Sequence, residues 1–587
     1  MRKFWRTASR SAHLPFIASA EETLSSFSAS GRALFYFFAG VLIISSLGLL
    51  YILNASLLVS TPAPGGTLSE GVVGSPRFIN PVLALSNADR DLSALVYSGL
   101  LRAMPDGGYV PDLAESFEVS PDGLTYTFVL RPGATFHDGT PVRATDIIFT
   151  ATKTEDPILK SPLRANWDGV TLEAVDERTV RFTLESPYAP FIKNLTLGIL
   201  PENLWQNVSS EEFPFSELNS MPVGSGPFRV NSISRTTSGI PSSYDLRPFT
   251  DYTLGRPYLD RMVLHFYQSE AALLEALKNG EVHAAGGITP GLLVQLPENI
   301  RIEHSPLNRV FGVFFNQNQS EVLRDKAVRQ ALSDAVDRGL LVTNVLAGYG
   351  TPLTEPVPSN LLNNVLLENN GEDLALKARS MLLSAGWTPG ENGILEKSTG
   401  VGTKKQTVRL SFSLSTGNVP ELRAAAEELR TMWGAMGAEV EVNIYEQGDL
   451  SQNVIRPRKY DALLFGEVIG RELDLFAFWH SSQRNDPGLN IALYANTTAD
   501  SVLEQLRKTG NPTERQALYE KFRAELKKDV PAVFLYAPDF VYTTPDTIEG
   551  LSLGFIETPS DRFLSILGWH TETDSVWPFF ATAATHE

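Results

Sequence analysis

Few residues in this chain have the types and spacing that catalysis requires. The chain contains no cysteine, which excludes disulfides, thiolate metal sites and a cysteine nucleophile. Ser225 lies between Gly224 and Gly226, but the full G-x-S-x-G spacing of a nucleophile elbow is missing. The eight histidines form no H-E-x-x-H pattern, so His480 is a poor candidate for a metal ligand. We therefore expect no catalytic residue, no metal, no cofactor and no enzymatic activity.

Composition indicates a large, acidic, globular protein. The 587 residues include 49 Lys and Arg against 67 Asp and Glu, which gives a formal charge of −18. A hydrophobic share of 43% is enough for full cores and argues against disorder. Nucleic acid is not an expected partner, because its recognition needs basic patches. The length predicts two or three lobes.

The clearest local structure lies in residues 110–150. Four apolar residues alternate there with Thr125, Thr127 and Val129, which is the periodicity of a strand. The turn at 120–123, Ser-Pro-Asp-Gly, has Pro second and Gly fourth, as a type I turn prefers, so a β-hairpin is expected. A breaker and a second turn follow, and Thr145 is placed to cap a helix. The alternating apolar residues are Leu124, Tyr126, Phe128 and Leu130.

This segment resembles a known protein family. Its order, A-E-S-F-x-V-S-x-D-G-x-x-Y-T-F-x-L-R-x-G-x-x-F-H-D-G-x-P-V-x-A-x-D, is similar to the signature region of the family 5 extracellular solute-binding proteins. These are the oligopeptide- and dipeptide-binding components of ABC importers. A second match reads VRQAL at 328–332, DR at 337–338 and GYGTP at 348–352, and a third lies at 375–387. The resemblance covers about residues 65–570, nearly the whole chain after the apolar N-terminal stretch.

The resemblance implies an α/β fold with two lobes. We expect a periplasmic-binding-protein-like fold of class II with an extra subdomain in lobe I, preceded by one transmembrane helix. The implied partners are a peptide ligand and the permease subunits of an ABC transporter. The expected organisation is a cytoplasmic segment at 1–32, an anchor at 33–59, a linker at 60–66, lobe I at 67–308 with its subdomain at about 100–221, lobe II at 309–524, and a return to lobe I with a C-terminal tail at 525–587.

Residues 33–59 predict a membrane anchor. They carry no charge and are long enough to span a bilayer. Basic residues dominate the segment before them, so the positive-inside rule places the N-terminus in the cytoplasm and the body outside the cell membrane, extracellular or periplasmic. A cleaved signal peptide is the alternative, but residues 61–63, Thr-Pro-Ala, make a poor cleavage site. The basic residues are Arg2, Lys3, Arg6, Arg10 and Arg32.

The resemblance also places the ligand. In peptide-binding relatives the ligand pairs with a protein strand through its main chain, and the matching strand here is residues 460–466. Relatives continue with a Trp and then an Asp that pairs with the α-ammonium of the peptide. Here Glu467 stands at the Trp position and Gly470 at the Asp position. Either Glu467 or Glu472 takes the ammonium, the ligand is not held by a free N-terminus, or both glutamates are solvated loop residues.

These considerations give a set of expected ligand-binding residues and two alternatives in function. The aromatic residues that follow the strand either wall side-chain pockets or belong to the core. The same fold would also serve an extracellular peptide chaperone or sensor without a transporter, or a binder of a non-peptide solute such as an oligosaccharide. The expected ligand-binding residues are Phe465, Gly466, Glu467, Val468, Glu472, Trp479, Asn316 and Asn490.

Overall fold

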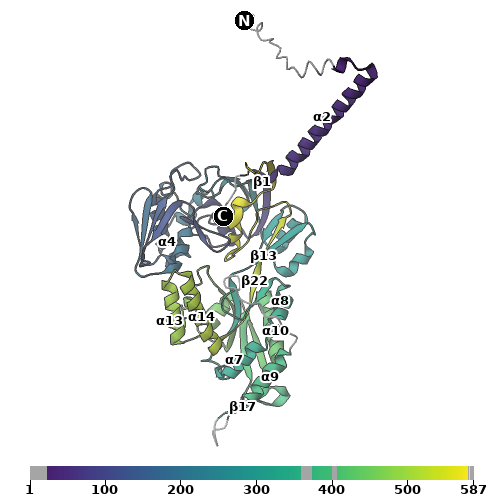
Figure 1. Ribbon diagram of the computed structural model, residues 1–587. Coiled ribbons are helices and arrows are strands. Elements are labelled where there is room, and N and C mark those ends of the chain that lie inside the picture. Colours follow the sequence, from purple (N-terminus) through teal and green to yellow (C-terminus); the bar gives the residue numbers. More distant parts are fainter. Residues whose placement is uncertain (1–22, 359–372, 400–405, 580, 582–587) are drawn as a thin grey trace. The chain divides into compact units, whose positions relative to one another are not determined.

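The computed structural model describes residues 23–358, 373–399, 406–579 and 581 (Figure 1). The expected cytoplasmic segment at 1–32 therefore lies largely outside the described residues, as do parts of lobe II and of the C-terminal tail. The chain forms two compact units, one made of Met1–Ala63 with Thr573–Glu587 and the other of Pro64–Glu572.

The first unit contains the apolar helix and a short sheet. Helix α2 (Ala29–Leu57) begins at Ser28, whose side chain accepts a hydrogen bond from the Gly31 amide, and none of its residues is buried. It is the one helix, among the described residues, that is long and apolar enough to cross a membrane. Strand β1 (Val59–Ala63) pairs with β23 (Glu572–Val576), so the expected linker at 60–66 is largely extended.

A mixed 12-stranded sheet organises the second unit. Its longest strand, β22 (Ala532–Pro545), pairs with β14 near its start and with β13 and β12 near its end, so one strand belongs to both lobes. This arrangement confirms the expected α/β class. The sheet order is β20 (Glu439–Tyr445), β19 (Ser411–Gly417), β21 (Ala462–Val468), β14 (Arg309–Phe315), β22, β12 (Ala284–Gly286), β2 (Gly65–Val73), β11 (Leu259–Tyr267), β10 (Pro241–Pro248) and β9 (Phe228–Arg235), with β13 (Ile300–Pro306) and β15 (Gly350–Pro352) also on β22.

A separate four-stranded sheet carries the expected hairpin. The turn at 120–123 joins β5 (Ala114–Val119) to β6 (Thr125–Leu130), and the sheet is completed by β8 (Thr179–Leu184) and β7 (Val170–Ala174). Tyr126 and Phe128 point into a buried core, as the alternation predicts. Helix α4 (Ala144–Glu155) packs on this sheet (Figure 1). Its cap is Arg143, not Thr145, because the Asp146 carboxylate reaches back to the Arg143 amide at 2.7 Å.

Two glycines let this subdomain join lobe I. A Cβ at Gly224 or Gly226 would lie 2.1 or 2.6 Å from backbone atoms of Val96, so only glycine permits the approach. The Gly224 amide donates to Nδ1 of His137, and Nε2 of His137 lies 3.0 Å from the Gly226 carbonyl oxygen. Ser225, between them, is buried. The Gly-Ser-Gly sequence is therefore a close-packed crossover.

Lobe II surrounds the other half of the sheet with helices. The apolar residues at 328–336 fall at helical spacing and predict one helix face, but α7 (Lys326–Asp334) ends before Asp337 caps α8 (Arg338–Leu346). The sequence Thr513-x-x-Gln516 predicts a capping box, but α14 (Pro512–Asp529) begins earlier and is capped by Asn511. The remaining long helices are α3 (Asn87–Val96), α6 (Glu270–Lys278), α9 (Leu374–Ser384), α10 (Pro420–Met436) and α13 (Thr497–Lys508).

Candidate functional site

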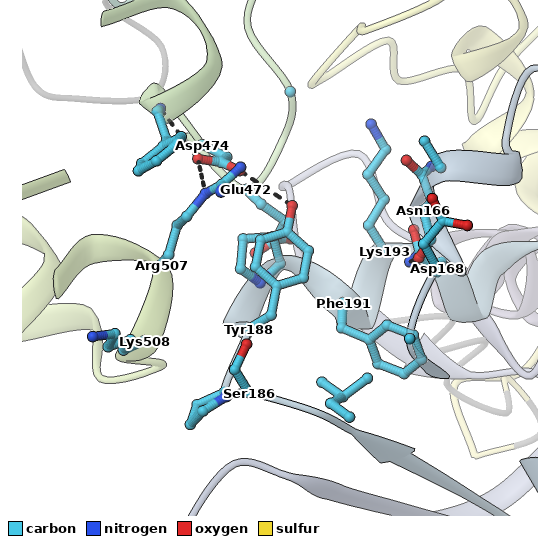
Figure 2. Close-up of a pocket in the computed structure, with 18 of the residues that line it drawn as sticks. Asn166, Asp168, Ser186, Tyr188, Phe191, Lys193, Glu472, Asp474, Arg507 and Lys508 are labelled. Carbon is cyan, nitrogen blue, oxygen red and sulfur yellow. Dashed lines mark hydrogen bonds and ion pairs between the residues drawn. The ribbon is translucent and has the colours of Figure 1, made fainter. Parts of the chain in front are cut away.

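A cavity of about 860 Å³ lies between the four-stranded subdomain and lobe II. The segment after β8, including the short helix η2 (Ala189–Thr196), forms one wall. The end of β21, the loop to α12 (Phe476–Trp479) and the end of α13 form the other wall. Figure 2 shows side chains from both walls facing one another. The volume is within the range of small-molecule sites, about 300–1,000 Å³.

A second cavity of about 770 Å³ adjoins the first and shares Tyr188, Glu472 and Lys508 with it. Its walls are the turn of the β5–β6 hairpin and the start of α14. Two adjoining cavities with a shared boundary suit an extended ligand better than a compact one. The hairpin that carries the sequence signature thus lies at the edge of this site.

A polar bridge connects the two walls. The Tyr188 hydroxyl donates to Oδ2 of Asp474 at 3.1 Å, and the Arg507 guanidinium donates to the same carboxylate at 2.7 to 3.0 Å (Figure 2). The guanidinium carbon of Arg507 also lies 4.0 Å from the centre of the Phe476 ring, a cation–π distance. The bridge joins the subdomain to lobe II beside the shared boundary of the cavities.

Charge is distributed unevenly between the cavities. Six acidic and three basic residues line the first, whereas two acidic and three basic residues line the second. The first cavity therefore favours a cationic group more than the second does. Its lining acids are Asp168, Glu185, Glu472, Asp474, Glu504 and Glu557, and its lining bases are Lys193, Arg507 and Lys508. The acids that line the second cavity are Asp122 and Glu472, and its bases are Arg471, Lys508 and Arg515.

Several of these charges already have protein partners. Lys193 forms an ion pair with Glu557, and Arg471 donates to the carbonyl oxygens of Met104 and Phe555. By contrast, no ion pair or hydrogen bond holds the Lys508 ammonium among the described residues. Lys508 is thus the cation in this site that is most available to a ligand anion.

Glu472 is the expected site residue that both cavities share. Burial raises the pKa of its carboxyl, and the nearby Tyr109 hydroxyl and Arg515 guanidinium partly oppose that shift. The position expected to hold an ammonium-binding Asp is Gly470, which lies in the wall of the first cavity. A Cβ there would lie 3.7 Å from Nζ of Lys193. That ammonium is itself paired with Glu557, so position 470 lies beside an ion pair.

Residues 465–468 lie in β21, not in a loop. The strand pairs with β14 along its whole length but with β19 only at Ala462 and Leu463. Beyond these two residues, no described strand pairs with the other edge of β21, although the Thr416 hydroxyl donates to the Leu464 carbonyl. The free edge leads directly to Val468, which lines the first cavity. Backbone groups of Gly466 and Val468 face this free edge, as the Leu464 carbonyl does, whereas those of Phe465 and Glu467 face β14. An added strand would therefore pair with Gly466 and Val468.

The Glu467 side chain points into an apolar core. Its cross-strand partner is Val310, and the neighbouring Phe465 and Leu463 belong to the same buried cluster. Only 3% of Glu467 is exposed, and neither carboxylate oxygen has a hydrogen-bond partner among the described residues. Burial raises the pKa of this carboxyl well above its usual range. Glu467 lines neither cavity, so of the two glutamates Glu472 faces the site.

The other expected site residues have local structural contacts. Trp479 is fully buried and packs against Phe314 and Phe534. The amide of Asn316 holds the turn after β14, and that of Asn490 bonds the backbone of His480 and Tyr494. None of the three lines either cavity. Their contact with a ligand stays a prediction.

Sequence reasoning missed the residues that come from the opposite wall. Tyr188 and Lys193 follow the second hairpin of the subdomain, and Lys508 ends a helix of lobe II. Nothing in their local sequence marks them, because they meet only when the subdomain packs against lobe II. Asp474 had a weak signal, since it lies two residues after Glu472.

Both the sequence and the structure of this chain are similar to those of known solute-binding proteins. The model of the bacterial extracellular solute-binding proteins, family 5, matches residues 108–487. The chain is 28% identical over 513 residues to oligopeptide-binding protein AppA of Bacillus subtilis, covering 85% of this chain and 91% of AppA. It is 30% identical to protein XP55 of Streptomyces lividans, covering 82% and 85%. The structure of AppA in complex with a nonapeptide superposes with a TM-score of 0.64 at 26% identity, covering 87% of this chain and 99% of that one.

Proposed function

The chain belongs to the bacterial extracellular solute-binding proteins of family 5, and on this premise we propose that it is the membrane-anchored binding component of an ABC importer for peptides. It carries out no chemistry on its ligand. The observation that supports a peptide most is the free edge of β21, which leads into a cavity of about 860 Å³. An extended peptide can pair with such an edge through its main chain and so bind with little dependence on its side chains.

The charges of the site orient the peptide. Glu472, at the boundary of the cavities, takes the α-ammonium, and the peptide N-terminus lies on the acidic side of that boundary. Lys508, which also borders both cavities, takes a ligand carboxylate. A charge that enters a closed site needs such a partner, because an unpaired buried charge is costly. The similarity to AppA, whose structure holds a nonapeptide, supports a ligand of several residues.

Helix α2 anchors the protein to the membrane. Its 29 residues are exposed along their length and carry no charge after Arg32. A cleaved signal sequence has a shorter apolar region, about 7–15 residues. The body, residues 64–572, then stays at the outer surface of the cell membrane, close to the permease to which it delivers the peptide.

Native mass spectrometry of the full chain released from detergent micelles tests the ligand class. A ladder of co-purified masses that fragment as peptides is the expected result. A bound sugar would move the protein to the oligosaccharide alternative. An empty protein that also fails to bind a synthetic nonapeptide library would contradict peptide capture.

A second assay separates an importer component from a chaperone or sensor. The full chain, reconstituted with an ABC permease from the same organism, should stimulate ATP hydrolysis in the presence of the co-purified peptide. Peptide binding without any stimulation would favour the chaperone or sensor role. The variant Lys508→Ala provides a matched control, since it should weaken the response through affinity alone.

A further inference from the structure

The C-terminal segment lies beside the outer end of helix α2. Only Leu58 separates α2 from β1, and the Thr61 hydroxyl donates to the Asp574 carbonyl oxygen at 3.3 Å. Further from the helix, Gly66 lies against Thr571. From the first of these contacts to the second, the residue number rises on the N-terminal segment and falls on the C-terminal segment. Strands β1 and β23 are therefore antiparallel. The chain that leaves β23 at Val576 therefore runs back toward the end of α2.

Two exposed aromatic side chains come directly after strand β23 in the chain. Trp577 is 36% exposed and Phe579 is 73% exposed, with their ring centres 6.0 Å apart. On the neighbouring segment, Leu57 and Val59 are exposed too. The antiparallel pairing brings Trp577 to the level of Leu58. An apolar patch thus continues from the membrane helix onto the C-terminal segment, both within one compact unit.

The length of α2 sets the depth of this patch. At about 1.5 Å per residue, 29 residues extend over roughly 43 Å, whereas the hydrocarbon core is about 30 Å thick. The helix is therefore long enough to reach into the headgroup region. Aromatic side chains, tryptophan above all, are enriched at this depth, because the ring is apolar and the indole N–H can bond to water or lipid oxygens.

We propose that Trp577 and Phe579 insert into the headgroup region of the bilayer that α2 spans. The C-terminal segment is then a second membrane contact, formed because β23 pairs with β1. The partner is the lipid surface itself, and the inference rests on the anchoring role of α2 proposed above. A helix alone leaves the attached body free to turn about one point, whereas a second contact restricts that rotation.

The absence of cysteine makes the test direct, because one introduced cysteine takes one nitroxide label. Three single-cysteine variants of the full chain are reconstituted in vesicles of phosphatidylcholine and phosphatidylglycerol at 3:1. They are Leu47→Cys in α2, Ser238→Cys in the exposed β9–β10 turn and Ala581→Cys after the aromatic pair. Collision rates with oxygen and with a water-soluble nickel chelate report the depth of each label.

The expected oxygen-to-nickel ratio is highest at Leu47, lowest at Ser238 and several-fold above the Ser238 value at Ala581. Adding Trp577→Ser and Phe579→Ser should lower the Ala581 ratio to the Ser238 value. The control Phe215→Ser removes another exposed aromatic, 83% exposed, and should leave the Ala581 ratio unchanged. These substitutions are at exposed positions, so folding is not at risk.

The outcomes separate the two proposals. An Ala581 label as accessible to nickel as Ser238, with Leu47 in lipid, overturns the second contact and leaves the anchor intact. An Ala581 ratio that survives loss of both aromatics also overturns the second contact. A Leu47 label outside the lipid overturns the anchor and, with it, the inference built on it.

Discussion

The Tyr188 hydroxyl lies 3.1 Å from a carboxylate oxygen of Asp474, and this hydrogen bond joins two walls that are 286 residues apart in the chain. Arg507 holds the same carboxylate from the side of lobe II. The bridge lies where the two cavities share Tyr188, Glu472 and Lys508. The position of the subdomain against lobe II therefore depends on a few polar contacts around the space that the ligand would occupy.

Removing the Tyr188 hydroxyl should loosen this contact. The variant Tyr188→Phe loses one hydrogen bond to a charged group, about 1.5–3 kcal/mol, so the two walls should sample wider separations. Double electron–electron resonance between labels at Glu118→Cys and Lys521→Cys should show a broader distribution shifted to longer distances. Asp474→Asn should act in the same direction. A distribution identical to that of the labelled wild-type chain would show that the bridge does not hold the walls.

The two glutamates should differ in their effect on binding. Glu472→Gln removes the proposed ammonium partner, and the affinity for the co-purified peptide should fall by about tenfold or more. Glu467→Gln should leave the affinity nearly unchanged, since Glu467 lines neither cavity. Isothermal titration calorimetry measures both effects. The N-acetylated form of the peptide is the control, and it should bind the Glu472→Gln variant and the wild-type chain with similar affinity. The reverse order of the two variants would place the ammonium at Glu467.

Glu467 should instead affect stability, with a definite pH dependence. Burial raises the pKa of its carboxyl in the folded protein, so the unfolded chain releases this proton at lower pH. The contribution to stability is present below the ordinary carboxyl pKa and is lost as pH rises through the folded value. Between pH 5 and 8 the wild-type chain should lose about 1 kcal/mol or more relative to Glu467→Gln. Urea unfolding of both proteins measures this, and parallel curves would mean that the carboxyl is not the titrating group.

His137 should make the crossover sensitive to acid. Burial lowers the pKa of His137 to about 4 from its ordinary 6.5. The Gly224 amide donates to Nδ1, so a proton there would break that bond. The unfolded chain takes up the proton first, and stability is therefore lost as pH falls from 6.5 to 4, by on the order of 3 kcal/mol. The variant His137→Gln does not titrate, and its unfolding free energy should lack this part of the pH slope. An equal slope in both proteins would contradict the assignment.

The sequence predicted those features that depend on neighbouring residues. The turn at 120–123 and the alternation after it determine the β5–β6 hairpin locally, and the uncharged stretch determines α2. Glu472 was one of two glutamates that the sequence offered as a partner for a ligand ammonium, and it lines both cavities. The predictions at helix starts were less accurate, because Asp146 and Asn511, rather than Thr145 and Thr513, make the capping hydrogen bonds.

The opposite wall of the site could not be predicted in this way. Tyr188 and Lys193 reach the cavity only through the packing of the subdomain on lobe II, and no periodicity records that contact. The direction of the Glu467 side chain was also not predicted from the sequence. Its charge suggested a ligand contact, whereas the alternation of β21 turns the side chain into the apolar core and its backbone groups face β14.

Hydrogen–deuterium exchange of the full chain with and without the co-purified peptide tests the central claim, that the ligand adds as a strand to β21. Exchange in the segment 462–470 should become several-fold slower on peptide addition, because backbone amides at the free edge gain partners. The β9–β10 hairpin, in the distant half of the sheet, should exchange at the same rate in both samples. Peptide binding that calorimetry detects, without any slowing in 462–470, would contradict main-chain capture at this edge.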